Sequence, residues 1–489
     1  MELHAILSAL ADSGANPAIR NIAKALTTVG AGTNLSALTG GGALRAENLD
    51  PVLAAVSVEN QHFKFFNMLL PGKRDSFSML DQAVVKKAIG GFPGSAIATE
   101  TGVGQVERAG DYQRLVTELG VFSTRRSVSL VTAFQGALQA QQGVVDFSAA
   151  EEEDVNAALE ILVTLEDSLF YGNKAADATQ INGLLTSIQN AGSTSNVVDM
   201  AGAALGGHSP ITNLASKITS AGKWGQPNEL FCGPLVKSEL DNTLISGYRL
   251  NLDNGVPNTE VGVPVKAMRY SSVGIADGLL NINNSAFITE DKVPVEVNYP
   301  TAPTLTAPAT VTAAAAAAAG SKFLAAHAGS YFYRVEEWAP GKVSPTTVLT
   351  NVGVPTAVAV VAGNKVTLTI TQGSATGTYY KIYRGRKGGS SAANDMRLIA
   401  VVAKTAGVQT FDDFNAVIPG TSELFLVENK PAVLRWLQML PLTKVPFAMT
   451  DFNYPWGAIL LGALRVTAPQ KVGAIINILP TAKTWDPFN

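Results

Sequence analysis

Few residues of this chain combine the type and the spacing that metal binding or catalysis requires. The four histidines, His4, His62, His208 and His327, are scattered along the sequence, and none has a second ligand at metal-binding spacing. The single cysteine, Cys232, lies in the apolar run NELFCGPL, which is typical of a buried and inert thiol. One cysteine also excludes an intramolecular disulfide bond. These residues predict neither a metal site nor a reactive thiol.

Three other stretches carry groups that chemistry could use. The glycines of GGFPGSAIATETGVG, residues 90–104, lack the strand-to-helix setting that holds a phosphate. The acidic run Glu151–Asp154 could bind a cation, but it coincides with the start of a predicted helix, where the helix dipole favours negative charge. Asp412 and Asp413 end a predicted strand, where contacts within a turn are expected.

The sequence also lacks the short motifs that accompany common enzymatic mechanisms. It contains no Walker loop, no G-x-S-x-G nucleophile elbow, no HExxH motif and no CxxC motif. We therefore predict that the chain is not an enzyme and has no catalytic residue, no metal-binding residue and no cofactor.

The clearest structural element is a long amphipathic helix over residues 146–173. Ser148 and Glu151 form a capping box, and Gly172 with Asn173 is expected to end the helix because both tolerate a left-handed backbone. At 1.5 Å per residue such a helix is roughly 30–35 Å long. Apolar residues at helical spacing predict one buried stripe, formed by Val155, Ala158, Leu159, Leu162, Leu165 and Leu169.

The segments before this helix have little core of their own. Residues 1–50 are rich in small side chains and predict an extended arm with one or two short helices. Residues 76–130 consist of a glycine-rich stretch followed by a strand-like sequence over 112–130. They predict a long two-stranded projecting loop, which needs contacts with another surface because a two-stranded ribbon alone is marginally stable. Between them, residues 51–75 are predicted to be helical. The core candidates of this helical segment are Phe63, Phe65, Phe66 and Met68.

After the long helix the sequence predicts a mixed α/β region. Short strands are expected at Val197–Met200 and at Glu229–Cys232. Helices are expected to start at Ser209-Pro210 and after Gly233, where Pro234 takes the first turn.

From residue 300 the composition changes. The proline-, threonine- and alanine-rich stretch 300–320 predicts a linker or a weak helix. From about residue 330 to 419, short strands separated by Gly, Pro and Asn turns predict an immunoglobulin- or fibronectin-like sandwich of roughly 100 residues. Its inward-facing candidates are Tyr331, Tyr333, Val335, Val366, Leu368, Ile370, Tyr380, Ile382 and Leu398.

The mixed text resumes at residue 421 and ends in two predicted strands, Ala458–Thr467 and Val472–Ile478. A sandwich whose flanking sequences both belong to a mixed α/β region is expected to be an insertion into a host domain, at an exposed site of that domain.

Composition limits the classes of function. Apolar residues make up 46% of the chain and charged residues 15%, below the usual level of about a quarter, so burial between subunits would help to cover a neutral surface. The net charge of -3 and the absence of a basic arm argue against a general attraction to nucleic acid or anionic membrane. No signal peptide and no run of the ~18 apolar residues needed to span a membrane is evident, so we expect a soluble protein made in a reducing compartment.

Taken in order, these features resemble the major capsid proteins of tailed bacteriophages. The predicted helix ends in EDSLFYGN and is followed by TQINGLLTSI and the short strand NVVDM. The strand-then-helix segment GKWGQPNELFCGPLVKSELDN and the closing WLQMLPLTKVPFA and WGAILLGALRVTAPQKVGAIINI are similar to that family's layout. The stretches GSYFYRVEEWAPGKVSP, YYKIYRG and TFDDFNAVIPGTSELFL resemble the immunoglobulin-like insertions of some larger phage capsid proteins. The resemblance covers most of the chain and rests on the order of these motifs.

The resemblance implies an α+β fold of the tailed-phage capsid type, with an N-terminal arm, an extended loop, a spine helix, peripheral and axial domains, and an inserted all-β Ig-like sandwich. The implied segments are 1–75 for the arm and short helices, 76–145 for the extended projecting loop, 146–299 for the spine helix with the peripheral and axial α/β region, 300–420 for the Ig-like insertion with its linker, and 421–489 for the return to the axial and peripheral domain.

The function that the resemblance implies is structural. Subunits would assemble as hexamers and pentamers into an icosahedral capsid that encloses double-stranded viral DNA without specific contacts. The implied partners are other copies of the chain and, in addition, decoration, portal or scaffolding proteins, with no membrane partner. The implied location is the virion, assembled in the cytoplasm of the host bacterium. The sequence shows no highly charged, scaffold-like N-terminal segment, and the Lys, Asn and Glu set that cross-links some relatives is not placed here.

Two alternatives stay open at this point. The first is an encapsulin-like bacterial compartment shell, which has the same fold. The second is a cell-surface adhesin or carbohydrate-binding protein that uses the sandwich, and for it we would expect a secretion signal.

Overall fold

A computed structural model of the chain gives an α+β fold, as predicted. Its described residues belong almost entirely to one compact unit, Ser57–Ser129 with Glu153–Asn489. The predicted arm at 1–50 and the glycine-rich stretch 90–104 lie outside the described residues. The structure describes residues 60–86, 112–131, 149–192, 195–248, 272–275, 278–290, 292–294, 304–339, 341–351, 354–449, 452–483 and 485–489.

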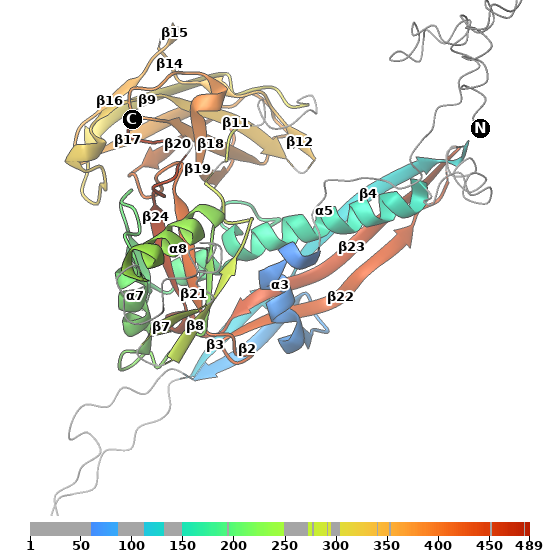
Figure 1. The fold of residues 1–489 in the computed structure, drawn as a ribbon. Coiled ribbons are helices and arrows are strands. Elements are labelled where there is room, and N and C mark those ends of the chain that lie inside the picture. The colour runs from blue at the N-terminus through green and yellow to red at the C-terminus, as the bar shows by residue number, and fades with distance from the viewer. Residues whose placement is uncertain are drawn as a thin grey trace, which may run out of the picture. The chain divides into compact units, whose positions relative to one another are not determined.

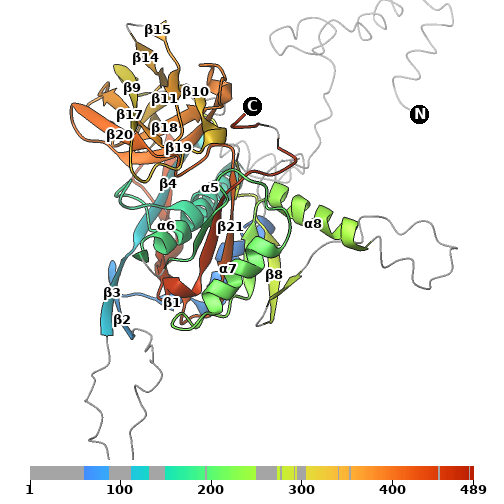
Figure 2. The same cartoon turned by 90° about the vertical axis from the view of Figure 1, so that its left-hand side faces the viewer.

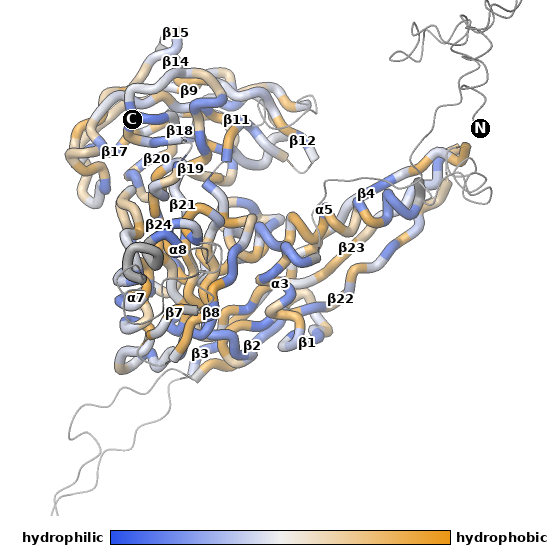
Figure 3. Tube along the Cα trace, viewed as in Figure 1, coloured by the Kyte–Doolittle hydropathy of each residue, from blue (hydrophilic) through white to orange (hydrophobic). Residues whose placement is uncertain are grey.

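The long predicted helix is present as α5, Ala149–Tyr171. Its buried side is a row of hydrophobic residues that repeats every four positions. Along the helix as a whole, hydrophobic and hydrophilic residues alternate (Figure 3). The row consists of Ala157, Ile161, Leu165 and Leu169. Leu165 and Leu169 are therefore confirmed as core residues, whereas the predicted Val155 is 52% exposed. The buried stripe differs from the predicted one in its first residues. Positions 157 and 161 are four residues apart, so they also fall on one side of a helix together with Leu165 and Leu169.

The end of α5 has a different cause from the predicted one. Neither Gly172 nor Asn173 has a positive φ. Instead, a Cβ on Gly172 would lie 2.4 Å from the Ile181 carbonyl oxygen, and the Gly183 N–H donates to the Gly172 carbonyl at 2.8 Å. Close approach of the following backbone therefore requires glycine here.

Helix α5 lies along a sheet of four strands in the order β1-β22-β23-β4 (Figure 1). Their bounds are β1 Arg74–Asp75, β22 Leu434–Pro446, β23 Asn453–Val466 and β4 Gly120–Ser129. We call this the long sheet, because β22 and β23 have 13 and 14 residues. The predicted closing strand at 458–467 is confirmed as part of β23.

The predicted strand text over 112–130 divides between two sheets. Strand β3, Tyr112–Glu118, pairs only with β2, Leu80–Lys86, in an antiparallel two-stranded ribbon among the described residues. After the buried Leu119, β4 leaves the ribbon and pairs with β23 in the long sheet.

A second sheet has six strands in the order β5-β24-β21-β6-β8-β7, with two parallel and three antiparallel pairings. Four of these strands precede the sandwich in the chain and two follow it. Their bounds are β5 Val197–Asp199, β6 Glu229–Cys232, β7 Ser272–Ile275, β8 Gly278–Asn284, β21 Ser422–Val427 and β24 Gly473–Ile478. The predicted strands at 197–200, 229–232 and 472–478 are confirmed.

Both faces of the six-stranded sheet are buried, and its side chains alternate between two cores. On β21, Leu424 and Leu426 join the core under two helices, α7 (Ser209–Thr219) and α8 (Pro234–Tyr248). The intervening Phe425 packs in the core of α5, on the side where α6, Leu184–Gln189, also lies. Figure 2 shows β21 between these two groups of helices. Both predicted helix starts, at 209 and 234, are confirmed.

The segment before the ribbon forms three short helices, as expected from its apolar text. These are η4 Asn60–His62, α3 Lys64–Leu69 and η5 Leu70–Gly72. Phe63, Phe65 and Phe66 are buried, and Met68 packs partly buried against the α5 core.

The region from 304 to 413 is a β-sandwich with a core of its own. One sheet has the order β20-β17-β9 and the other the order β12-β11-β18-β19, with β13 beside β11. The main strands are β9 Thr310–Ala317, β17 Asn364–Thr371, β20 Val408–Asp413, β11 Tyr333–Ala339, β18 Tyr379–Gly385 and β19 Met396–Ala403. The shorter elements are η8 Ala325–His327, β10 Gly329–Tyr331, β12 Lys342–Val343, β13 Thr347–Val348, β14 Thr350–Asn351, β15 Val354–Pro355, β16 Val358–Val360 and η9 Ala393–Asp395. An Ig-like relationship for this sandwich stays a prediction.

Two predictions for the sandwich are wrong in detail. The alanine-rich stretch expected as a linker or weak helix contains strand β9, which pairs with β17 along its whole length because Val311, Ala313 and Ala315 face the core. The predicted core residue Leu398 lies outside the core, and Ile399 takes its place. A register shift in the β18–β19 pairing turns Ile399 inward. The other eight inward candidates are confirmed.

Strand β9 gives the first testable prediction. Ala313→Asp places a charge against the sandwich core, so we expect a loss of unfolding free energy of at least ~2 kcal/mol. The matched control Ala314→Asp faces solvent and should change it by less than about 0.5 kcal/mol. Chemical denaturation of both variants measures this, and equal effects would contradict the strand register.

Candidate functional site: a helix braced on the long sheet

Glu166, on the buried side of α5, joins this helix to the start of α3. Its side chain is fully buried, and its two carboxylate oxygens accept hydrogen bonds from the backbone N–H groups of Phe65 at 2.8 Å and Phe66 at 2.9 Å. The residue before α3, Phe63, makes no side-chain cap. Glu166 therefore satisfies first-turn N–H groups that lack a local partner, from 100 residues further along the chain.

The environment of Glu166 changes its protonation. Burial raises the pKa of this carboxyl from 4.5 to about 7, although the N–H groups of Phe65 and Phe66 act in the opposite direction. The group therefore titrates near neutral pH, at the junction of two helices.

An aromatic cluster surrounds this junction. Phe170, on the last turn of α5, stacks on Phe65 with ring centroids 4.9 Å apart. It also contacts Phe231 of β6 at 5.9 Å and Phe425 of β21 at 5.5 Å. A further pair, Phe66 and Trp436, meets edge to face at 5.4 Å and extends the cluster to β22 of the long sheet. Side chains from α3, α5 and both sheets thus form one core.

The first half of α5 is also tied to the long sheet by ion pairs. Arg126 of β4 contacts Glu160 at 2.7 Å and Glu153 at 3.5 Å, and Lys444 of β22 contacts Asp154 at 2.7 Å. These groups are partly exposed, so each pair contributes about 0–1 kcal/mol. Two members of the predicted acidic run are therefore partners of basic residues on the sheet.

The structure brings none of the histidines or the cysteine together. His62 lies in η4, His208 precedes α7, His327 lies in the sandwich, and His4 is outside the described residues. Burial raises the pKa of the Cys232 thiol to about 12, which agrees with the inert thiol predicted from its apolar neighbours. Among the described residues, no group of three His, Cys, Asp or Glu side chains could hold a metal ion.

The predicted turn contacts of the Asp412–Asp413 pair are only part of their role. Asp413 does accept the backbone N–H of Asn415 at 2.8 Å, but it also forms a buried ion pair with Arg384 at 2.6 Å. Asp412 pairs with Lys365 on the neighbouring strand at 2.7 Å. Sequence reasoning missed the Arg384 pair because its members are 29 residues apart.

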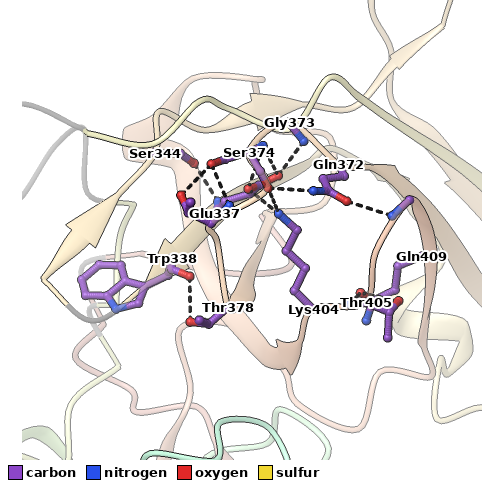
Figure 4. Close-up of polar contacts among 12 residues, drawn as sticks. Glu337, Trp338, Ser344, Gln372, Gly373, Ser374, Thr378, Lys404, Thr405 and Gln409 are labelled. Atoms are coloured by element: carbon purple, nitrogen blue, oxygen red, sulfur yellow. Dashed lines mark hydrogen bonds and ion pairs between the residues drawn. The ribbon is translucent and has the colours of Figure 1, made fainter.

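A second buried ion pair in the sandwich was not predicted (Figure 4). Glu337 of β11 is fully buried and accepts hydrogen bonds from Lys404 at 2.8 Å and from the Gly373 N–H at 2.7 Å. The Ser374 N–H donates to the same carboxylate at 3.1 Å. The sequence feature that could have indicated this ion pair was the acidic pair Glu336-Glu337 inside a predicted strand. These contacts fix a turn to a strand, which is a structural role.

One hollow of about 820 Å³ lies beside α7 and β5. Its described lining is mostly apolar and hydroxyl side chains and includes Lys217 and Lys223. In the part of the chain that the structure describes, no helix has the length and apolar character needed to cross a membrane.

Glu166 gives the second prediction. Because its folded-state pKa of about 7 lies above the ordinary 4.5, the folded chain binds more protons than the unfolded chain between these values. The unfolding free energy of the chain should therefore fall as pH rises through this window, by roughly 1–3 kcal/mol. Glu166→Gln should remove that component, and the control Thr164→Ala, on the exposed side of α5, should keep it. Denaturation at pH 5 and pH 8 measures this, and an unchanged pH dependence in the Gln variant would contradict it.

Comparison with known proteins shows a relative that matches along nearly the full length. The chain is 24% identical over 480 residues to the putative major capsid protein of Enterococcus phage phiEF24C, which covers 94% of this chain and 95% of the relative. A stretch of 107 residues is 29% identical to the major capsid protein of Staphylococcus phage K and covers 22% of this chain and 20% of that one. No family model matches the chain.

Solved structures give weaker likenesses. The capsid of cyanophage A-1(L) aligns with a TM-score of 0.42 and 10% identity over 89% of this chain and 98% of that chain. An encapsulin complex from Synechococcus elongatus PCC 7942 aligns with a TM-score of 0.38 and 9% identity over 90% of this chain and 94% of that chain. Likenesses of this size carry no argument by themselves. The relative that matches 94% of this chain confirms the predicted resemblance to major capsid proteins of phages.

Proposed function

We propose that this chain is the structural subunit of a phage capsid, which assembles as hexamers and pentamers into an icosahedral shell around double-stranded DNA. The observation that carries this proposal is the match over 94% of the chain to a protein named as a putative major capsid protein. The chain has no enzymatic role in this proposal. Its location is the virion, after assembly in the host cytoplasm.

The two-stranded ribbon supports a role in assembly. Several of its apolar side chains are exposed: Leu80 at 52%, Val84 at 74%, Tyr112 at 62% and Val116 at 51%. The preceding Phe77 is 97% exposed. A two-stranded ribbon is marginally stable alone, and apolar side chains on both of its strands are suited to contact with a neighbouring subunit.

Described residues at the adjoining ends of β22 and β23 form a second group of exposed apolar side chains, which we call the apolar tip. Phe447, Met449 and Phe452 are 40%, 50% and 82% exposed, and Tyr454 is 38% exposed. These residues lie at the ends of two long paired strands whose other parts pack in the core of α5. An apolar tip of this kind is suited to a permanent contact between copies.

The proposed segments of the capsid subunit follow one another along the chain. Residues 1–75 are the arm and short helices, 76–145 the extended loop, 146–299 the spine helix with the peripheral and axial region, 300–420 the inserted sandwich, and 421–489 the return. Decoration, portal and scaffolding proteins are proposed partners of the assembled shell.

The named relatives favour this function over the two alternatives. An encapsulin-like compartment would share the fold, but the relatives that match in sequence are phage capsid proteins. An adhesin or carbohydrate-binding protein would depend on the sandwich alone, whereas the match extends over 480 residues.

The apolar tip gives a test of the proposed function. Phe452→Asp changes a side chain that is 82% exposed, so the subunit should keep its thermal stability and lose most of its ability to form shells. The matched control Val361→Asp changes a sandwich residue that is 60% exposed and should assemble like the wild type. Sedimentation velocity and light scattering give the fraction in megadalton particles. Equal assembly of both variants would contradict the role of the tip, and an absence of particles from the wild type would contradict the function.

A further inference from the structure

The last five residues of the chain, Trp485–Asn489, lie against both the sandwich and the six-stranded sheet. We call them the C-terminal tail. They follow strand β24 after a short connection, and Pro487 is buried.

Trp485 is held by the connection between β18 and β19 of the sandwich. Its indole N–H donates to Asp395 at 3.2 Å, and the Arg397 guanidinium lies over its ring at 5.0 Å. Asp395 is only 5% exposed and is itself fixed by Arg386 at 2.8 Å and by the Ser390 N–H at 2.6 Å. The indole therefore meets a prearranged acceptor and a cation.

Phe488 is held by His327 from another part of the sandwich. The two rings are stacked, with centroids 4.5 Å apart and an interplanar angle of 4°. His327 is 3% exposed, and its Nδ1 atom lies 3.0 Å from the side-chain nitrogen of Asn415, which orients the imidazole ring. Between the two aromatic residues, the Lys387 N–H donates to the Pro487 carbonyl at 2.8 Å.

Two glycines outside the sandwich make room for the same rings. A Cβ on Gly202, which follows β5, would lie 2.5 Å from the Phe488 ring. A Cβ on Gly420, which precedes β21, would lie 2.4 Å from the Trp485 ring. The rings thus occupy slots with sandwich side chains on one side and glycine backbone of the six-stranded sheet on the other.

We propose that the base of the sandwich and these two glycines form a peptide-binding site whose occupant is the C-terminal tail of the same chain. The site takes a short peptide with two aromatic side chains separated by Asp-Pro, and recognises it through the Asp395 acceptor, the His327 ring and the Lys387 N–H. By filling this site, the tail fixes the sandwich to the six-stranded sheet. The proposal does not depend on the proposed function, because it concerns contacts within one subunit.

A binding experiment tests the site directly. The probe is a fluorescein-labelled peptide of residues 481–489, TAKTWDPFN, added to a chain that ends at Pro480. Fluorescence anisotropy should show saturable binding, and peptides with W485A or F488A should bind at least ~10-fold more weakly. Absence of binding to a truncated chain that keeps its circular dichroism spectrum would overturn the proposal, as would equal binding of the F488A peptide.

Glycine variants supply a matched control in the full-length chain. Gly202 and Gly363 have the same φ of +80°, but a Cβ on Gly363 meets nothing within 4 Å. Gly202→Ala and Gly363→Ala therefore carry the same backbone strain, and only the former fills the Phe488 slot. The tail should become accessible to carboxypeptidase in Gly202→Ala and stay protected in Gly363→Ala. Equal protection in the two variants would overturn the proposed slot.

Hydrogen exchange gives a readout that needs no truncation. In the full-length W485A/F488A variant, the amide of Lys387, which is bonded to Pro487, should exchange at least ~10-fold faster. The amide of Gly385, two residues away and bonded to Phe332 within the sandwich, should be unchanged. An unchanged Lys387 amide would overturn the proposal, and faster exchange at both amides would show that the variant loosens the sandwich itself.

Discussion

The packing of α5 against two sheets at once is the constraint on which the rest of the structure depends. The row through Ile161 and Leu165 belongs to the core that covers the long sheet, and Phe170 continues the same core onto β6 and β21 of the six-stranded sheet. The two sheets are separate hydrogen-bonded units, so their common core is what joins them. A helix of 23 residues can do this because its buried side is long enough to reach both.

Buried charges mark the places where distant segments must meet in one arrangement. Glu166 orients the start of α3 on α5, Glu337 fixes the turn at Gly373 to β11, and the pair of Arg384 with Asp413 joins two strands of the sandwich. In the two ion pairs of the sandwich, Glu337 with Lys404 and Arg384 with Asp413, removing one member leaves an uncompensated buried charge, which typically costs about 3–5 kcal/mol. The exposed pairs of Arg126 and Lys444 contribute far less, so they guide the orientation of α5 more than they stabilise it.

Local patterns in the sequence predicted elements well where neighbouring residues decide the outcome. The proline at 234 and the serine and proline at 209–210 marked two helix starts, and alternation in 366–370 marked core strands. Prediction failed where contacts with residues distant in the chain decide the local structure. Alanines at 313 and 315 form a strand because β17 lies beside them, and a register shift turned Ile399 inward in place of Leu398. The Glu166 contact with α3 spans about 100 residues and leaves no local signal.

We propose that the helix-braced sheets are the rigid part of the subunit and that the apolar elements at their margins make the contacts of assembly. Electron microscopy of the purified protein tests this proposal. We expect closed icosahedral particles built from hexamers and pentamers. A protein that stays monomeric at every concentration and ionic strength tried, with its fold intact, would contradict it.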